Sequence, residues 1–444
     1  MTFLLLIFGI SAVLFVTVLF HAFLEPSGKA YCLISVMSLF LAVEWASAQT
    51  SNIRALFMVA ELLVVLILAL YSMLNKNNID RRDGHVLFCL LGGLVACNFI
   101  ACITTYGDFF IFLWSTYDSC KYFAVSFALM AMNLSRKDIK AVVAFISLLI
   151  LVCFFISACQ FAGLESLFDP FRGRYGIVIR SGSYRAIGFF PYPIELGNWA
   201  TMMFALVYGF NRAYFKSKVL DCISFLCLLT AAFSGTRTAL IAILIVYVLS
   251  NFGSFKKGAK IAVVVFAAIA CIASFLPLDE IVSRLSLDVT TELPRQYYFV
   301  KGLEVWSGHP LFGIGFGTFG AMRYRDLTQD YIFNLYNIHK FDSAGLASTD
   351  SFYSEVIPEY GIIGIFLLLA LAYMVFLAIR KKGPNAKAAF PVLLAALVLA
   401  INSSTAFTSA HVGLYFWLAL GLLFTPNHQS ISGSRSLDKG APSE

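Results

Sequence analysis

The residues best suited to chemistry in this sequence are arginines that interrupt or flank apolar stretches. Arg237 stands in the polar turn Ser234-Gly235-Thr236-Arg237, between the apolar runs 219–233 and 238–252. An arginine at the centre of a membrane span costs about 2.5 to 3.5 kcal/mol, and less near the interface, so its presence there calls for a compensating role. The functional interpretation is a planar guanidinium that holds a phosphate or carboxylate. The alternative is an arginine at a helix start whose long side chain extends to the interface.

A second group of arginines lies between about residues 163 and 192, and comprises Arg172, Arg174, Arg180 and Arg185. Arg185 opens a segment with glycine and proline that leads into the next apolar run. Irregular backbone at membrane depth is tolerated where it is buried in protein or lines a wet cavity. We therefore expect Arg180 and Arg185, which are nearest to the re-entry point, to face such a cavity. Contact with lipid headgroups is the alternative, above all for Arg172 and Arg174.

A much longer polar stretch, from about residue 277 to 350, contains Arg295 and His309. Residues 294–306 place Phe299, Leu303 and Trp306 on one helical face, which predicts a helix lying on the membrane domain. A glycine run follows, and its residues 315–320 match G-x-G-x-x-G. We reject a dinucleotide site because a lone match is weak and no parallel βαβ pattern surrounds it. The glycines predict a tight turn.

The end of this stretch carries a carboxylate and a phenol, Asp350 and Tyr353, just before another apolar run. An aspartate before a helix is a common N-cap. The functional alternative is a general base, or a residue that orients an acceptor hydroxyl, at the mouth of a cavity. The two roles are compatible.

The composition predicts that a membrane domain positions these residues. The sequence is 60% hydrophobic and 13% charged, against about 25% charged residues in soluble proteins. The apolar residues fall in blocks of spanning length. We predict an all-α polytopic membrane protein with about 12 to 13 transmembrane helices in one domain, residues 1–425. The thirteen candidate spans are 3–24, 30–48, 55–74, 85–105, 109–132, 141–162, 193–210, 219–233, 238–252, 261–276, 362–379, 388–401 and 406–424.

Basic residues cluster in every second loop between these spans, and cytoplasmic loops retain lysine and arginine. The clusters are Lys76/Arg81/Arg82, Arg136/Lys137/Lys140, Arg212/Lys216/Lys218, Lys256/Lys257/Lys260 and Arg380/Lys381/Lys382/Lys387. This pattern predicts that loops 163–192 and 277–350 are extracytoplasmic and that 426–444 is a disordered cytoplasmic tail. The N-terminus is then outside, or inside if one early span is re-entrant. We expect 3–24 to be a retained helix because no basic residue precedes it and no cleavage site follows.

Several other classes of function find no support in the sequence. The net charge of +7 is scattered over short loops, so we expect no nucleic-acid partner. The ten cysteines lie in or beside apolar segments without a C-x-x-C pair, and no hydrolase, Walker or H-E-x-x-H signature occurs. We expect no metal and no cofactor. Asp118 and Lys121, one helical turn apart within a span, are interpreted as a mutually neutralising pair, with a polar path as the alternative.

Several motifs in order resemble the O-antigen ligase and polymerase superfamily of bacterial envelopes. They are Ser234-Gly235-Thr236-Arg237-Thr238-Ala239, Arg295, His309-Pro310-Leu311-Phe312-Gly313-Ile314-Gly315-Phe316-Gly317-Thr318-Phe319, Thr349-Asp350-Ser351-Phe352 and Glu359-Tyr360-Gly361-Ile362-Ile363-Gly364. The resemblance covers about residues 185–369. No single motif is specific, but their order and spacing are.

The resemblance implies a GT-C-like, inverting, metal-independent glycosyltransferase of the bacterial inner membrane with a periplasmic active site. Its donor would be a glycan on undecaprenyl pyrophosphate. Arg185 and Arg237 match the arginines that grip the pyrophosphate, and Arg295 matches an arginine of the large periplasmic loop. Asp350 stands where ligases typically have a histidine, which favours a polymerase of O-antigen, capsule or exopolysaccharide repeat units.

We therefore predict Asp350, Arg237 and Arg185 as catalytic residues, and Arg180, Arg295, His309 and Tyr353 as substrate-binding residues. Membrane lipids and a chain-length regulator are the implied partners, the latter from the resemblance alone. An O-antigen ligase that transfers polymer to lipid A core is the alternative within the superfamily. A lipid-linked oligosaccharide flippase or transporter is the alternative from another class, although transporters tend to show internal repeats and midplane charges.

Overall fold

The fold is helical almost throughout, as the apolar blocks predict. The computed structural model describes residues 28–47, 51–79, 81–164, 179–180, 183–251, 294–319, 330–336, 338, 352–381, 383–403 and 406–425. The candidate spans 3–24 and 261–276, Arg172, Arg174, Asp350 and the tail 426–444 lie outside these residues. Within them, the only β structure is one antiparallel pair of two-residue strands, β1 (Ile179–Arg180) and β2 (Ser183–Tyr184).

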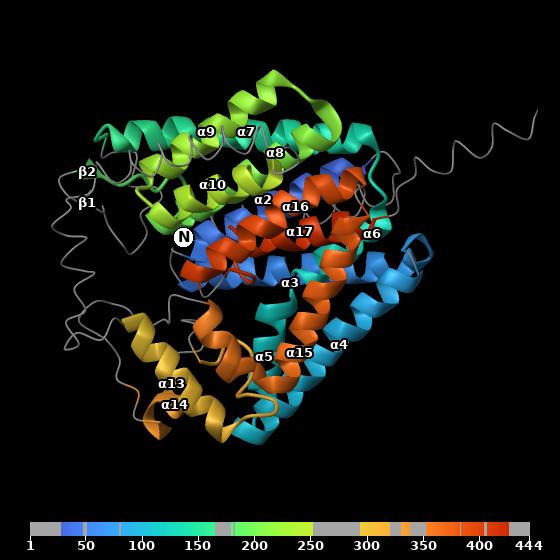
Figure 1. The fold of residues 1–444 in the computed structure, drawn as a ribbon, viewed down its shortest axis with the longest axis vertical. Coiled ribbons are helices and arrows are strands. Elements are labelled where there is room, and N and C mark those ends of the chain that lie inside the picture. The colour runs from blue at the N-terminus through green and yellow to red at the C-terminus, as the bar shows by residue number, and fades with distance from the viewer. Residues whose placement is uncertain are drawn as a thin grey trace, which may run out of the picture.

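The helices follow the predicted spans closely, and Figure 1 shows most of them running side by side. In chain order they are α2 (Lys29–Ser47), α3 (Ser51–Leu74), α4 (Arg81–Tyr106), α5 (Phe109–Cys120), α6 (Phe123–Met132), α7 (Arg136–Phe161), α8 (Pro193–Phe210), α9 (Lys218–Phe233), α10 (Arg237–Asn251), α13 (Pro294–Gly308), α14 (Asp330–Leu335), α15 (Phe352–Arg380), α16 (Pro384–Leu399) and α17 (Gly413–Phe424).

Length and composition make this a multi-pass membrane protein. Among the described residues, three helices are long and apolar enough to cross a bilayer, namely 82–106, 136–161 and 352–380. Six shorter apolar helices of 10–17 residues accompany them. Many large apolar side chains on these helices are exposed, among them Phe88 at 67% and Phe155 at 68%. Exposed apolar side chains of this kind are favourable in contact with lipid, whereas soluble proteins rarely expose large apolar surfaces to water.

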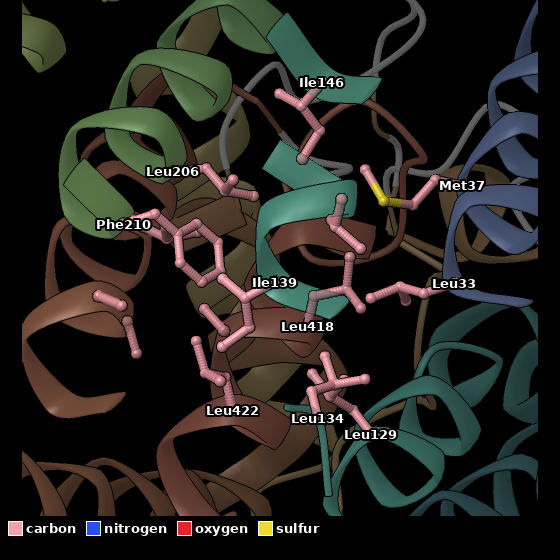
Figure 2. A pocket seen from close by; sticks show the side chains of 15 residues that line it. Leu33, Met37, Leu129, Leu134, Ile139, Ile146, Leu206, Phe210, Leu418 and Leu422 are labelled. Atoms are coloured by element: carbon pink, nitrogen blue, oxygen red, sulfur yellow. The ribbon is translucent and has the colours of Figure 1, made fainter. Parts of the chain in front are cut away.

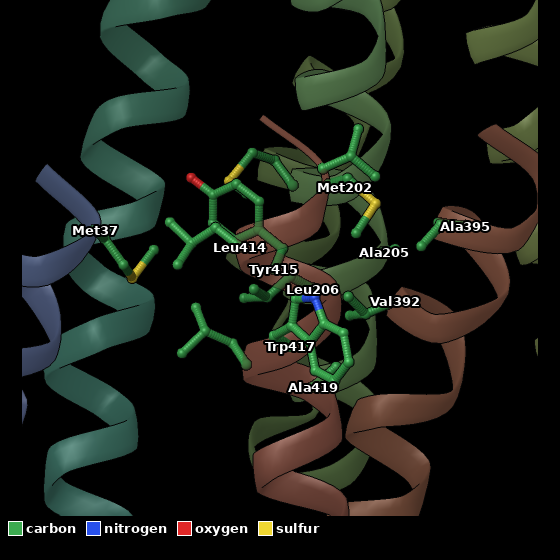
Figure 3. Packing of buried hydrophobic residues seen from close by; sticks show 14 of the residues in the cluster. Met37, Met202, Ala205, Leu206, Val392, Ala395, Leu414, Tyr415, Trp417 and Ala419 are labelled. Atoms are coloured by element: carbon green, nitrogen blue, oxygen red, sulfur yellow. The ribbon is translucent and has the colours of Figure 1, made fainter. Parts of the chain in front are cut away.

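The core is centred on α8, whose side chains are buried along nearly its whole length. Trp199 of α8 donates its Nε1 hydrogen to the Tyr415 hydroxyl of α17 at 3.2 Å. Figure 3 shows Met202, Leu206, Tyr415 and neighbouring side chains packed together between α8, α16 and α17. Small residues allow close helix contact, as is common in membranes: a Cβ on Gly209 would lie 2.4 Å from the Ala388 carbonyl oxygen of α16.

One predicted span is broken into two helices at its middle. The expected helix 109–132 is interrupted at Lys121 and Tyr122, between α5 and α6. Lys121 Nζ lies 3.3 Å from Asp118 Oδ1, so the predicted pair is confirmed, and it also lies 2.9 Å from Glu61 Oε1 of α3. The second carboxylate was not predicted. A buried cation inside the membrane is stabilised by such paired carboxylates.

Two further elements differ from the predicted bounds by seven residues or more. Helix α15 begins at Phe352, ten residues before the predicted span, and is broken at Gly361, where φ is 58° and ψ is −175°. Helix α17 begins only at Gly413, because residues 406–412 form turns instead of the expected helix. A small second apolar cluster, formed by Tyr298, Val305, Ile314, Phe319, Ile332, Phe333 and Ile338, joins α13 to α14. In Figure 1 these two helices lie at the lower left, beside the first part of α15.

Candidate functional site

Arg185 is fixed against the turn that leads from α9 into α10. Its Nε donates a hydrogen bond to the Ser234 carbonyl oxygen at 2.8 Å, and its Nη2 donates to Thr236 Oγ1 at 3.3 Å. The backbone N–H of Ala186 donates to the Phe233 carbonyl oxygen at 3.0 Å. Residues almost fifty positions apart in the sequence therefore meet at one corner of the helical bundle. We call Arg185 together with residues 234–237 the arginine corner.

The turn itself is shaped to receive this guanidinium. Gly235 has a φ of +63°, and a Cβ there would lie 3.1 Å from Arg185 Nε, so a larger residue would strain the turn and push the arginine away. Thr236 Oγ1 also donates to the Pro193 carbonyl oxygen at 3.2 Å, which ties the turn to the start of α8. Gly197 of α8 lets the turn approach closely, because its Cβ would lie 2.7 Å from Thr236 Cβ.

Arg237 is the first residue of α10, and its side chain is exposed. Within the described part of the chain, its guanidinium makes no hydrogen bond or ion pair. A cation at a helix N-terminus is unfavourable for the helix by about 0.3 to 1 kcal/mol, because the helix dipole is positive there. The same dipole adds to the attraction of an anion. Arg237 is thus badly placed for helix stability and well placed to bind a negatively charged group.

The segment that carries Arg185 is held from the other side by Gln160, near the end of α7. Gln160 Oε1 accepts hydrogen bonds from the N–H groups of Ile187 at 3.0 Å and Gly188 at 2.8 Å. Its Nε2 donates to the Gly188 carbonyl oxygen at 3.0 Å. Sequence reasoning missed this residue. The available signal was an amide side chain at the end of an otherwise apolar run, where a polar group needs a specific partner.

The glycine-rich residues 309–319, which we call the glycine loop, dock on the break in α15. The N–H groups of Ile314 and Gly315 donate to the carbonyl oxygens of Pro358 and Glu359 at 2.9 and 3.2 Å. In return, Ile362 and Ile363 donate to the carbonyl oxygens of Pro310 and Leu311 at 2.9 and 3.1 Å. The loop thus satisfies backbone groups that Pro358 and the kink leave without helical partners.

The glycines of this loop adopt the turn conformations that the sequence predicts. Gly313, Gly315 and Gly317 have φ values of 72°, 105° and 66°. A Cβ on Gly313 would lie 2.4 Å from the Glu359 carbonyl oxygen, and one on Gly361 would lie 2.5 Å from the Gly313 nitrogen. The two chain segments can therefore come together only because both residues lack side chains.

The other predicted substrate-binding residues are spread over this second region. His309 is half-buried at the end of α13, and burial lowers the pKa of its imidazole below the usual 6.5, so the ring is neutral at pH 7. Tyr353 is half-exposed, and its hydroxyl donates to the Leu397 carbonyl oxygen of α16 at 3.0 Å. Among the described residues, neither side chain contacts the arginine corner.

Three predicted residues are described in part or not at all. Arg180 lies in β1 and Arg295 in the first turn of α13, but their side chains are outside the description. Asp350 lies outside the described residues, two positions before α15. Their roles stay predictions. In the described part of the chain, no three His, Cys, Asp or Glu side chains gather as a metal site would require.

A small apolar cavity lies elsewhere, among α2, α6, α7, α8, α16 and α17 (Figure 2). Its lining includes Leu33, Met37, Leu206, Phe210 and Leu418, and all fifteen lining residues are apolar. It offers no hydrogen-bonding side chain to a sugar and no charge to a diphosphate. Leu206 and Phe210 belong to the last turns of α8, whereas the arginine corner contacts its first turn. The cavity is therefore separate from the candidate site.

Comparison with protein families gives a match over one third of the chain. Residues 222–369 match the O-antigen ligase family. The matched segment contains Arg237, the glycine loop and Tyr353, whereas Arg185 precedes it. No curated protein matches the sequence. The match shows similarity of this segment to proteins that transfer polysaccharide in the manner of O-antigen ligases.

Proposed function

We propose that this protein is a polysaccharide repeat-unit polymerase, which transfers a glycan from undecaprenyl pyrophosphate to the sugar of a second lipid-linked acceptor. One observation carries the proposal: the Arg185 guanidinium is hydrogen-bonded to the Ser234-Gly235-Thr236 turn, which continues directly into the exposed Arg237. Two cations at one corner match the charge of a diphosphate. The second of them lies in the segment that matches O-antigen ligases.

In the proposed reaction, the bond between the anomeric carbon of the donor sugar and the pyrophosphate oxygen breaks. The electron pair stays with the pyrophosphate, whose growing negative charge Arg185 and Arg237 stabilise. A preorganised donor at such a position contributes roughly 3 kcal/mol to the transition state. The acceptor hydroxyl attacks the anomeric carbon from the opposite face, so the configuration inverts. Asp350 accepts the hydroxyl proton as the new glycosidic bond forms.

The choice of a polymerase over a ligase rests on Asp350, which replaces the histidine typical of ligases. Mass spectrometry of glycans in a strain that lacks the gene separates the two. Loss of a polymerase leaves single repeat units on the final carrier. Loss of a ligase leaves finished polymer on undecaprenyl pyrophosphate. Detection of long undecaprenyl-linked polymer in the deletion strain would therefore replace the polymerase assignment with the ligase one.

A flippase would also need a cationic surface for a lipid-linked diphosphate, and a purified protein distinguishes it from an enzyme. We expect the protein in detergent to elongate a lipid-linked repeat unit, because the reaction needs no second compartment. Absence of elongation, together with movement of the lipid-linked glycan across vesicle membranes, would contradict the proposal. The proposed enzyme works at the periplasmic face of the bacterial inner membrane, where a chain-length regulator is its proposed partner.

A further inference from the structure

The glycine loop is held by two polar side chains from helices that flank it, in addition to its backbone pairing. The carboxylate of Glu359 accepts hydrogen bonds from Gly317 N–H at Oε2, 2.7 Å, and from Phe319 N–H at Oε1, 2.9 Å. Asn98 Oδ1, from α4, accepts from Phe316 N–H at 2.8 Å. Three N–H groups within four residues of the loop therefore donate hydrogen bonds to side-chain oxygens.

Both side chains are buried, and their chemistry fits the positions they occupy. Glu359 is 3% exposed and Asn98 is 0% exposed. Burying a carboxylate is unfavourable unless hydrogen bonds compensate it, and a carboxylate offers acceptors on both oxygens. Asn98 uses its amide differently: its Nδ2 donates to Ser115 Oγ and Thr116 Oγ1 of α5, at 2.8 and 2.9 Å, which orients Oδ1 toward the loop.

The loop connects the two helices on which the predicted substrate-binding residues lie. It begins at His309, where α13 ends, and it docks on α15, which carries Tyr353 and follows Asp350. Helix α13 also packs directly on the first part of α15, because a Cβ on Gly302 would lie 3.1 Å from the Ser354 carbonyl oxygen. Glu359 therefore contributes, together with the backbone pairing and the contact between α13 and α15, to the position of His309 relative to the start of α15.

We propose that Glu359 is a positioning residue for glycan transfer and that Asn98 assists it. Glu359 touches no substrate. Its carboxylate keeps the glycine loop on the kink of α15, so that the groups on α13 and those at the start of α15 meet the acceptor sugar in one fixed arrangement. This inference rests on the proposed function. The glycine loop is also excluded as a diphosphate site, since the carboxylate of Glu359 already occupies the N–H groups of Gly317 and Phe319.

The test compares Glu359→Gln with Glu304→Gln in the purified, full-length protein. Glutamine keeps the size of the side chain but turns an NH₂ group toward one of the two loop N–H groups. Glu304 is an exposed glutamate of α13, paired with Lys301 at 2.8 Å, and serves as the matched control. A displacement of about 1 Å at a reacting geometry costs on the order of 100-fold in rate. We expect kcat per folded protein to fall about 100-fold for Glu359→Gln, with KM for the lipid-linked donor within about threefold.

A second variant and a second measurement keep the inference testable if Glu359→Gln folds poorly. Asn98→Ala removes the other side chain and should lower kcat about tenfold, again with little change in donor KM. Hydrogen exchange of the Gly317 and Phe319 amides should accelerate in Glu359→Gln and not in Glu304→Gln. Wild-type kcat in folded Glu359→Gln or Asn98→Ala, or an equal loss in the control, would overturn the inference. An inactive wild-type protein would contradict the proposed function, while the exchange measurement would still test the contact of Glu359 with the loop.

Discussion

The arginine corner and the glycine loop differ in the charge that each holds: the corner carries guanidinium groups, and the loop encloses a carboxylate. At the corner, Arg185 is fixed through a carbonyl and a hydroxyl oxygen, which are neutral acceptors, and Arg237 beside it is exposed. In the loop, the carboxylate of Glu359 is enclosed, and backbone N–H groups end on both its oxygens. The negative group serves as an internal anchor for the loop, whereas the positive group of Arg237 is exposed at the corner. The corner is therefore the region suited to a diphosphate, although the loop has the glycine pattern often associated with phosphates.

The largest expected effect is the loss of activity when a cation is removed from the arginine corner. Arg237→Ala and Arg185→Ala should each lower polymerisation by about 100- to 1,000-fold, because each removes one preorganised cation from the leaving group. Arg185→Lys should recover only part of the activity, since a compact ammonium lacks the planar fork whose Nε and Nη2 reach the Ser234 carbonyl and the Thr236 hydroxyl while other N–H groups stay available to the diphosphate. The loss of activity can be measured as polysaccharide chain length on gels and as the turnover rate of the purified protein.

Arg380→Ala is the matched control for these variants. Arg380 is exposed at the last residue of α15, and its guanidinium lies over the Phe376 ring at 5.8 Å, within the same helix. We expect normal chain length for this variant. Long chains in cells that carry inserted Arg185→Ala or Arg237→Ala would remove the basis of the proposed function.

The second effect concerns the stability of the glycine loop. Gly361→Ala should lower the free energy of unfolding by about 3 kcal/mol or more, because a side chain at φ 58° is strained and its Cβ would meet the loop backbone at 2.5 Å. Gly92→Ala, in α4, is the control: nothing lies within 4 Å of a Cβ there. It should stabilise the helix by about 0.5 to 1 kcal/mol. Thermal unfolding in detergent would show the two shifts in opposite directions, and equal shifts would contradict the docking of the loop on α15.

A smaller effect is expected where the corner meets α7. Gln160→Leu should cost about 1 to 3 kcal/mol, because the N–H groups of Ile187 and Gly188 lose their acceptor while buried. Arg185 lies two residues before Ile187, so activity should fall as well, by roughly tenfold. Gln160→Glu keeps an acceptor for both N–H groups and should retain more activity than Gln160→Leu. Equal activity of both variants with wild type would show that Gln160 does not support the corner.

The smallest effect is a pH dependence from His309. Its pKa is lowered in the folded state by burial, so the unfolded chain takes up a proton first as the pH falls below 6.5. Stability from this residue is therefore fully present above that pH and declines as the pH falls toward the folded-state pKa. His309→Gln should flatten this part of the profile of unfolding temperature against pH. An unchanged profile in the variant would assign the dependence to other groups.

The fold was largely predictable because each helix that spans a bilayer requires a long run of apolar residues, which is visible in the sequence. The bounds of α8 match the predicted span 193–210. Helix α9 starts one residue before its predicted span and ends with it, and α10 differs from its predicted span by one residue at each end. The breaks were not predicted, since each depends on tertiary partners: Lys121 is stabilised by Glu61 from another helix, and the kink at Gly361 is completed by the glycine loop. Hydrophobic periodicity contains no information on such contacts.

The charged residues of the candidate site could be predicted from the sequence. The side chains that hold these segments in place could be predicted only in part. The cost of an arginine at membrane depth pointed to Arg237, and the irregular entry to α8 pointed to Arg185. The structure brings Arg185 to the turn that ends in Arg237, which sequence alone could suggest but not place. Gln160, Asn98 and Glu359 were missed as supports because each acts through backbone groups far away in the sequence.

The most direct test of the central claim measures binding of undecaprenyl pyrophosphate to the purified protein in lipid nanodiscs, without any acceptor. Wild type and Arg380→Ala should bind equally. Arg185→Ala and Arg237→Ala should each raise the Kd roughly tenfold or more, since a charge-assisted hydrogen bond contributes about 1.5 to 3 kcal/mol to binding. Equal Kd values for all four proteins would contradict the assignment of the arginine corner as the diphosphate site.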